Sequence, residues 1–232
     1  MRVSRNIIVG LGAALAVSLG SVPAFADYYA FGYSGYDSQE TLSLSTSSGP
    51  VALTTNGFQG WFSPVDTNTA GPSDNTNYVT GISSGISYND FFAFDVSSLS
   101  GDTVTAASLN VTNYDVTNPL NLRLGAVSVP SDALYNGVSP DVAIYDALGS
   151  GTLYGNYALE AEYNDSIDSF ALNSAAIGDI NSDIGGANQY FVVGGTVNSL
   201  ASIPEPSTLL LMLSIFSTIA AGRILRRRRV VC

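Results

Sequence analysis

Two neighbouring stretches decide the predicted fold: Asn89-Asp-Phe-Phe-Ala-Phe-Asp-Val96 and Val104-Thr-Ala-Ala-Ser-Leu-Asn-Val-Thr112. Their apolar residues alternate with period two, which places every second side chain on the same face of a strand. These shared faces carry Phe92, Phe94 and Val96 in the first stretch, and Ala107, Leu109 and Val111 in the second. Asp95 ends the first strand, and Ser97-Ser98 and Gly101-Asp102 are turn-forming residues. We therefore expect a buried strand, a turn, and a second strand that pairs back on the first.

Strand-forming segments recur along residues 27–203. Further strands are predicted at Thr41–Thr46, Asn121–Val129, Thr152–Glu162 and Gln189–Val197. Gly, Asn, Asp and Pro separate these segments at intervals of roughly 8 to 15 residues, a spacing typical of antiparallel sandwiches rather than of βαβ units. The predicted fold class is therefore all-β, an antiparallel β-sandwich.

One short helix is expected within this β-rich segment. Asn173 is a favourable N-cap, and Ile177, Ile180 and Ile184 follow at the spacing of one helix face. Gly185-Gly186 would end the helix. The segment Asp141–Leu148 fits either a helical turn or a strand, and its pattern does not separate the two.

The charge distribution excludes several classes of function. The chain of 232 residues contains no His and no Lys, and only 12% of its residues are charged. Residues 27–203 hold 18 of the 19 acidic residues but only one of the eight Arg, so their net charge is −17. Such a surface repels phosphate backbones, which argues against a nucleic-acid partner. The lack of His excludes a Ser-His-Asp triad and His-ligated zinc, and the single cysteine, Cys232, cannot form a disulfide within the chain.

The first 26 residues are typical of a secretory signal peptide. Arg2 and Arg5 precede the uncharged apolar run Ile7–Leu19, and Ala24-Phe25-Ala26 supplies a small-residue cleavage site. We expect signal peptidase to cleave between Ala26 and Asp27. The alternative interpretation, an uncleaved N-terminal anchor, fits the short apolar run less well.

The last residues, 201–232, indicate a membrane-spanning tail. After Pro204-Glu205-Pro206, the 15 uncharged residues of Thr208–Gly222 would span about 22 Å as a helix. Extension to Leu225 gives about 27 Å, close to the ~30 Å of a hydrocarbon core. The basic residues after the span predict a single transmembrane helix with a cytoplasmic C-terminus, so that the middle of the chain lies outside. These membrane-stop residues are Arg223, Arg226, Arg227, Arg228 and Arg229.

This tail resembles the PEP-CTERM sorting signal of Gram-negative bacteria. The resemblance rests on Pro204, Glu205 and Pro206 before an apolar span and a terminal Arg cluster. Ile203 stands where the family often has Val. The resemblance implies recognition by an exosortase, a membrane-embedded cysteine transpeptidase, with removal of the tail and transfer to the outer surface or the exopolysaccharide matrix. The alternative is a plain C-terminal anchor.

A second resemblance concerns the exported segment. Phe91–Gly101 with Val104–Val111, and Phe170–Asn181 with Phe191–Gly195, are similar to segments of secreted jelly-roll modules found in PEP-CTERM proteins. The resemblance implies a jelly-roll-like sandwich and carries no activity with it.

A polar loop and a pair of glutamates are weak candidates for chemistry. The loop Pro64–Tyr78 contains Asp66, Asn68, Asp74, Asn75 and Asn77, oxygen donors of the kind that bind Ca²⁺. The spacing matches neither an EF-hand loop nor the RTX nonapeptide, which favours a solvated loop. Glu160 and Glu162 would lie about 7 Å apart on one face of a strand, tolerable for glycoside hydrolysis, but such a pair more often marks an exposed strand.

Aromatic residues give a stronger indication. The group comprises Tyr28, Tyr29, Phe31, Tyr33, Tyr36, Phe58, Trp61 and Phe62. Sugar rings stack on exposed aromatic faces while Asn, Asp and Gln bind their hydroxyls. The competing interpretation, which we favour, places Trp61 and the Phe residues in the core.

The sequence thus predicts a signal peptide at 1–26, an extracytoplasmic domain at 27–200 and a sorting tail at 201–232. We expect an exported structural or adhesive protein of the cell surface or exopolysaccharide matrix, formed from an inner-membrane-anchored precursor. The alternative is a secreted carbohydrate-binding module with a specific glycan ligand. The expected partners are signal peptidase, an exosortase-type transpeptidase, extracellular polysaccharide and, before processing, the membrane. No catalytic, cofactor-binding or metal-binding residue is predicted, and an enzyme is not expected.

Overall fold

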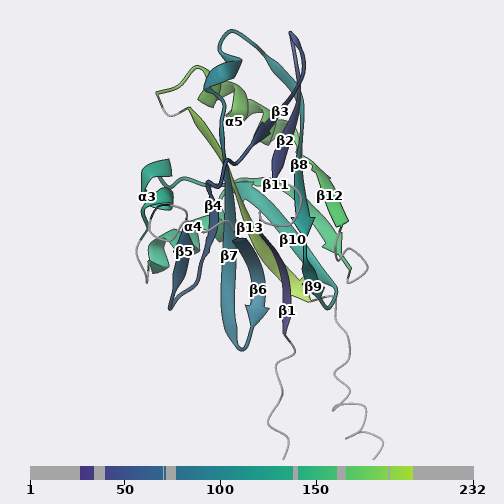
Figure 1. The fold of residues 1–232 in the computed structure, drawn as a ribbon, viewed down its shortest axis with the longest axis vertical. Coiled ribbons are helices and arrows are strands. Elements are labelled where there is room, and N and C mark those ends of the chain that lie inside the picture. Colours follow the sequence, from purple (N-terminus) through teal and green to yellow (C-terminus); the bar gives the residue numbers. More distant parts are fainter. Residues whose placement is uncertain are drawn as a thin grey trace, which may run out of the picture. The chain divides into compact units, whose positions relative to one another are not determined.

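The strand that contains Phe92 lies inside a large antiparallel sheet. The computed structural model describes residues 27–33, 40–69, 71, 77–137, 141–160, 166–187 and 189–200. The large sheet follows the order β11-β10-β13-β7-β6-β1-β9; in addition, β4 pairs with β7, and β5 pairs with β4 (Figure 1). Its strands are β1 (Tyr28–Tyr33), β4 (Gln59–Phe62), β5 (Thr67–Thr69), β6 (Asn77–Ser83), β7 (Ile86–Asp95), β9 (Asp115–Thr117), β10 (Leu120–Ala126), β11 (Leu153–Leu159) and β13 (Tyr190–Leu200).

A second, four-stranded antiparallel sheet has the order β12-β8-β2-β3. Its strands are β2 (Thr41–Thr46), β3 (Gly49–Thr54), β8 (Val104–Asn113) and β12 (Ser166–Ala171). The predicted all-β, antiparallel class is confirmed. The predicted strand at Thr41–Thr46 matches β2 in both bounds, and its alternation buries Leu42 and Leu44.

The two sheets share a hydrophobic core. β7 contributes Phe92 and Phe94, and β8 contributes Leu109 and Val111. Helix α5 (Ser174–Ile184) closes one part of this core with Ala176, Ile180 and Ile184. The predicted alternation is confirmed as a pattern of burial along Ala107–Val111 of β8. In β7 the predicted residues Phe92 and Phe94 do share the core face, but their neighbours are buried too.

The opposite face of β7 is buried as well. Phe91 and Ala93 belong to a second hydrophobic cluster, on the side where α3 (Ser131–Tyr135) and α4 (Val142–Ser150) lie. Figure 1 shows both helices beside β4 and β5. Burial on both faces explains why the sequence Phe91–Phe94 is continuously apolar, since a strand with one solvated face would alternate.

The expected pairing of β8 with β7 is wrong. After Asp95 the chain enters a short 3₁₀ turn, η1 (Ser97–Leu99), and β8 then pairs with β2 and β12 in the other sheet. The Asp95 carboxylate accepts a hydrogen bond from the Ser97 backbone N–H at 2.9 Å, while Val96 and Leu99 are buried in the shared core. The turn thus carries the chain across the core, and β7 and β8 contribute side chains to that core from different sheets.

The helix content also exceeds the prediction of one short helix. The predicted helix is α5, with the Asn173 side chain accepting from the backbone N–H groups of Ala175 and Ala176. The undecided segment at Asp141–Leu148 is α4, because Asp141 caps it through the Ile144 N–H at 3.1 Å and its apolar residues pack into the second cluster. With α3, the described part of the chain holds three α-helices.

The predicted ends of the protein lie outside the described residues. These comprise Ala26 and the signal peptide, the motif Pro204–Pro206, the transmembrane segment and the Arg cluster from Arg223 to Arg229. Across the ranges that are described, no helix has the length and hydropathy needed to cross a bilayer. Asp27, the residue after the predicted cleavage site, is described, and its carboxylate accepts from the Ser84 N–H at 2.7 Å.

Candidate functional site

A groove of about 400 Å³ opens where four segments meet. These segments are the loop before β4, the end of β7, helix α3 with its C-cap, and the start of β13. The residues that line the groove are Thr55, Asn56, Phe58, Asp95, Ser131, Asp132, Tyr135, Asn136 and Tyr190. Aromatic rings and hydrogen-bonding side chains therefore occur together in one concave site.

Three aromatic rings form the apolar part of the groove. Phe58 is 8% exposed and belongs to the second hydrophobic cluster. It meets Tyr135 and Tyr190 edge to face, with ring centroids 5.2 and 5.3 Å apart. Tyr135 is 42% exposed, so its ring is accessible from solvent while its position is fixed against Phe58.

Close backbone packing holds Tyr135 in place. Leu134 is fully buried in the cluster beneath α3. A Cβ atom at Gly71 would lie 2.5 Å from the Tyr135 carbonyl oxygen and 2.9 Å from its ring Cδ1. A Cβ atom at Gly137 would lie 2.6 Å from Cζ of Phe62. The absence of side chains at these two glycines therefore allows the segment that presents Tyr135 to pack against its neighbours.

Carboxylates and amides form the polar part of the groove. The hydrogen bonds from Ser97 lower the pKa of Asp95, which keeps this exposed carboxylate charged. Asp132 lies in the first turn of α3, and the Asn136 side chain donates to the Asp132 backbone oxygen at 3.2 Å. Asn56 has a left-handed backbone (φ 51°), and its side chain accepts from Thr54 Oγ1 at 2.9 Å.

The one arginine of the described residues lies elsewhere. The Arg123 guanidinium donates to the backbone oxygens of Gly149, at 3.2 Å, and Gly151. Gly151 packs so closely against β10 that a Cβ there would lie 1.8 Å from the Ala126 oxygen. Arg123 thus ties the end of α4 to β10 and contributes no charge to the groove.

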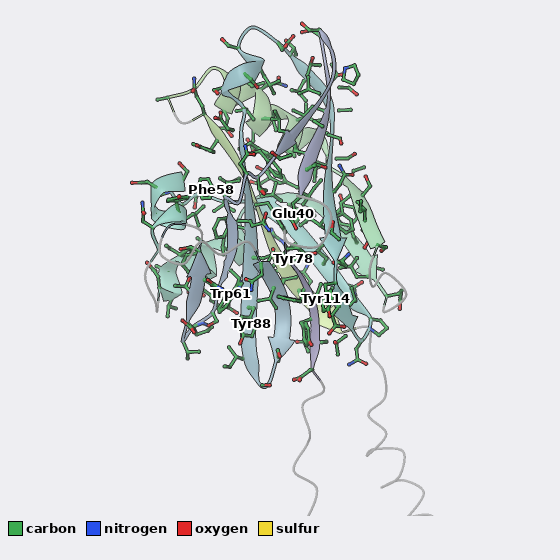
Figure 2. All side chains as sticks on the ribbon, in the orientation of Figure 1. Glu40, Phe58, Trp61, Tyr78, Tyr88 and Tyr114 are labelled. Carbon is green, nitrogen blue, oxygen red and sulfur yellow. The ribbon has the colours of Figure 1, made fainter. Side chains whose placement is uncertain are left out.

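Those aromatic residues of the predicted carbohydrate-binding face whose side chains are described do not form one surface, and Tyr36 and the Tyr33 side chain lie outside the described part. Phe58 lines the groove, but Phe62 is fully buried. Trp61 packs edge to face on Tyr88 at 5.1 Å, and its Nε1 donates to Asn77 Oδ1 at 3.1 Å. Figure 2 places Phe58 apart from the Trp61–Tyr88 pair and from Tyr114. Phe58 and Phe62 are buried as the favoured core interpretation expects, although in the second hydrophobic cluster and not in the core shared by the sheets. Trp61 and Phe31 are only partly buried.

The other candidates from the sequence lie only partly within the described residues. Glu160 is exposed and follows the last residue of β11, and Glu162 lies outside the described residues, so the pair has no defined geometry. In the polar loop, Asn77 Oδ1 accepts from the side chains of Trp61 and Asn68, whereas Asp74 and Asn75 are not described. Among the described residues, no group of three acidic or Cys side chains is placed to hold a metal ion.

Two buried carboxyl groups were not anticipated from the sequence. Glu40 is fully buried and Asp90 is 2% exposed. Within the described residues, both carboxyl oxygens of Glu40 and the Oδ1 of Asp90 lack a hydrogen-bond partner. Burial is the main cause that raises the pKa of each group to about 7.

Both carboxyl groups act on a third buried group, the hydroxyl of Tyr78. Tyr78 donates from its hydroxyl to the Thr112 backbone oxygen at 2.8 Å and lies 3.0 Å from Asn113 Oδ1. Burial, followed by the negative charges of Glu40 and Asp90, raises the Tyr78 pKa. Figure 2 shows Glu40 and Tyr78 among the side chains inside the fold. The Glu40 backbone oxygen accepts from the N–H of Thr55, a residue of the groove lining, at 3.2 Å, but the Glu40 side chain itself is fully buried.

Comparison with known proteins identifies no relative: no protein family, curated sequence or solved structure matches this chain. The function is therefore argued from the groove itself.

Proposed function

We propose that this chain is an exported adhesive protein of the cell surface or exopolysaccharide matrix, and that its groove binds polysaccharide. The observation that carries the proposal is the exposed Tyr135 ring, fixed against Phe58 and flanked by Asp, Asn and Ser side chains. A sugar ring has apolar C–H faces and a rim of hydroxyls. It therefore suits a site that combines aromatic faces with hydrogen-bonding groups.

The sheet arrangement supports a finer description of the fold. Two antiparallel sheets contribute to one core, and the chain crosses between them at η1. These features suit the jelly-roll-like sandwich that the sequence resemblance implies, a fold used by many carbohydrate-recognising proteins. We propose that the described domain binds without turnover.

Export and sorting form the second part of the proposal. The signal peptide at 1–26, the motif Pro204-Glu205-Pro206 and the terminal Arg cluster together favour delivery through an exosortase-type transpeptidase. Mass spectrometry of the mature C-terminus tests this part. We expect a product that ends near Pro206, whereas a chain intact through Cys232 is what a plain anchor predicts.

Binding is tested with immobilised polysaccharides and the purified full-length chain. Tyr135→Ala removes the exposed ring, and we expect affinity to fall about tenfold or more, because an aromatic contact contributes roughly 0.5–1.5 kcal/mol beyond its buried area. Tyr114→Ala is the matched control, because Tyr114 is 44% exposed and packs on Phe31 instead. Equal binding by both variants would refute the groove as the binding site.

A further inference from the structure

The charges of the groove restrict the kind of glycan that it accepts. Resting on the proposed polysaccharide binding, we infer that the groove takes a neutral glycan segment and rejects chains that carry carboxylate, sulfate or phosphate groups. The inference identifies the class of ligand and goes beyond the general statement that the protein binds extracellular polysaccharide.

The first argument is the sign of the charges that line the groove. Asp95 and Asp132 are the ionisable acids of the lining, and the bonds from Ser97 keep Asp95 charged. A sugar hydroxyl donates to a carboxylate, which gives a charge-assisted hydrogen bond. A uronic acid or sulfate group on the glycan is itself negatively charged and is repelled by these carboxylates. Each Asp carboxylate of the groove that faces such a group lowers the affinity about fivefold at low salt.

The second argument is that no Arg or Lys of the described residues is available to compensate this negative charge. Arg123, the one Arg or Lys in residues 27–203, has its guanidinium bound to two backbone oxygens at the end of α4. An anionic glycan usually requires Arg or Lys side chains that pair with its charges. With a net charge of −17 over residues 27–203, long-range repulsion adds to the local effect.

The third argument concerns what remains attractive in the groove. Tyr135 and Tyr190 offer ring surface, and Asn56 and Asn136 offer amides that both donate and accept. The hydroxyls and C–H faces of an uncharged hexose chain can make all of these contacts. The groove therefore contains the interactions that a neutral sugar uses and lacks those that an anionic sugar needs.

The test compares glycans that differ in charge. The full-length chain in mild detergent is titrated against neutral dextran, galactan and mannan, and against alginate, polygalacturonate and heparin, at low salt. A further pair, methyl-esterified and de-esterified polygalacturonate, presents one backbone with and without charge. We expect the uncharged chains to bind more tightly than the charged ones, with at least tenfold weaker binding of de-esterified than of esterified polygalacturonate.

A charge-neutral variant separates this inference from the proposed function. Asp95→Asn with Asp132→Asn keeps the size of both side chains, and the amide oxygen introduced at position 95 can still accept from Ser97. We expect the ratio of neutral to anionic binding to fall by about 25-fold, the product of two fivefold effects. The inference would be overturned if the wild type bound anionic chains but no neutral ones. If Tyr135→Ala also abolished that binding of anionic chains, the groove would still be the binding site. Absence of binding to every glycan would overturn both.

Discussion

Burial of Glu40 and Asp90 predicts an unusual dependence of stability on pH. Both groups have a pKa of about 7 in the folded protein, against 4.5 and 3.8 when unperturbed. The main cause is loss of hydration, because no cation among the described residues faces either group and Arg123 is bound elsewhere. Protonation of these carboxyls is therefore favoured in the folded state.

The sign of the effect follows from proton linkage. Below about pH 4 both the folded and the unfolded chain hold these protons, and the stabilising contribution is complete. Between about pH 4 and pH 7 the unfolded chain has lost the protons that the folded chain retains, so the free energy of unfolding falls as the pH rises. Above about pH 7 the contribution is lost in full. The pKa changes from 3.8 to about 7 at Asp90 and from 4.5 to about 7 at Glu40 correspond to on the order of 4 and 3 kcal/mol, and the mutual repulsion of Glu40 and Asp90 prevents simple addition.

Asp90→Asn tests this reasoning because it keeps the shape of the side chain and removes its charge. The Asp90 carboxyl occupies the space over Gly195, where a Cβ would lie 2.0 Å from Oδ1, and Asn fits the same volume. At pH 8 we expect the variant to be more stable than the wild type by on the order of 4 kcal/mol. At pH 4 this difference should disappear, because wild-type Asp90 is then protonated.

Urea unfolding at pH 4, 5, 6, 7 and 8 measures the effect. The single tryptophan, Trp61, packs on Tyr88 and reports unfolding by its fluorescence. Glu40→Gln serves as a parallel variant with the same expected sign. A wild-type stability that rises from pH 5 to pH 8, or an Asp90→Asn variant that is equally destabilised at every pH, would show that the carboxyls are not buried as described.

Three further changes test the packing and the groove. Gly195→Ala introduces a methyl group into the space of the Asp90 carboxyl, and we expect a loss of about 1–3 kcal/mol in the urea unfolding free energy at pH 5. Asn173→Ala removes the side chain that caps α5 through two N–H groups, and about 1 kcal/mol should be lost, seen as a lower thermal midpoint with unchanged glycan affinity. Gly71→Ala should displace Tyr135 and weaken glycan binding several-fold. Gly178→Ala in α5, where nothing lies within 4 Å of the added Cβ, is the matched control. Equal effects of the two substitutions on glycan binding would argue against a fixed Tyr135.

Local patterns account for much of the secondary structure. The alternation of Leu42 and Leu44 predicted β2 with both of its ends, and the cap at Asn173 with the Ile spacing predicted α5. Both signals arise from residues within one element, which is why sequence alone identifies them. The segment at Asp141–Leu148 remained open because a short apolar run fits either period, and the Asp141 cap together with packing on the second cluster resolved it as α4.

The candidate site was much less accessible to sequence reasoning. Phe58 was among the aromatic candidates, whereas Tyr135, Tyr190 and Asp132 were not. The groove brings together residues from four separate segments, and no short sequence motif indicates that these segments lie close together. Trp61 and Phe62 lie near Phe58 in the chain, but alternation along β4 directs Phe62 into the core and leaves Trp61 on the Tyr88 side.

By itself, the sequence determined the antiparallel β class, the acidic character of residues 27–203 and the residues that alternate into the core, because these depend on composition and on periods of two or four residues. Tertiary structure alone decided that β8 pairs with β2 instead of β7. It also decided that Glu40 and Asp90 are buried without cations, and that a groove forms beside Tyr135. A period of two specifies which face of a strand is buried but not which strand lies beside it. Pairing, desolvation and concave surfaces all depend on contacts between residues that are distant in the chain.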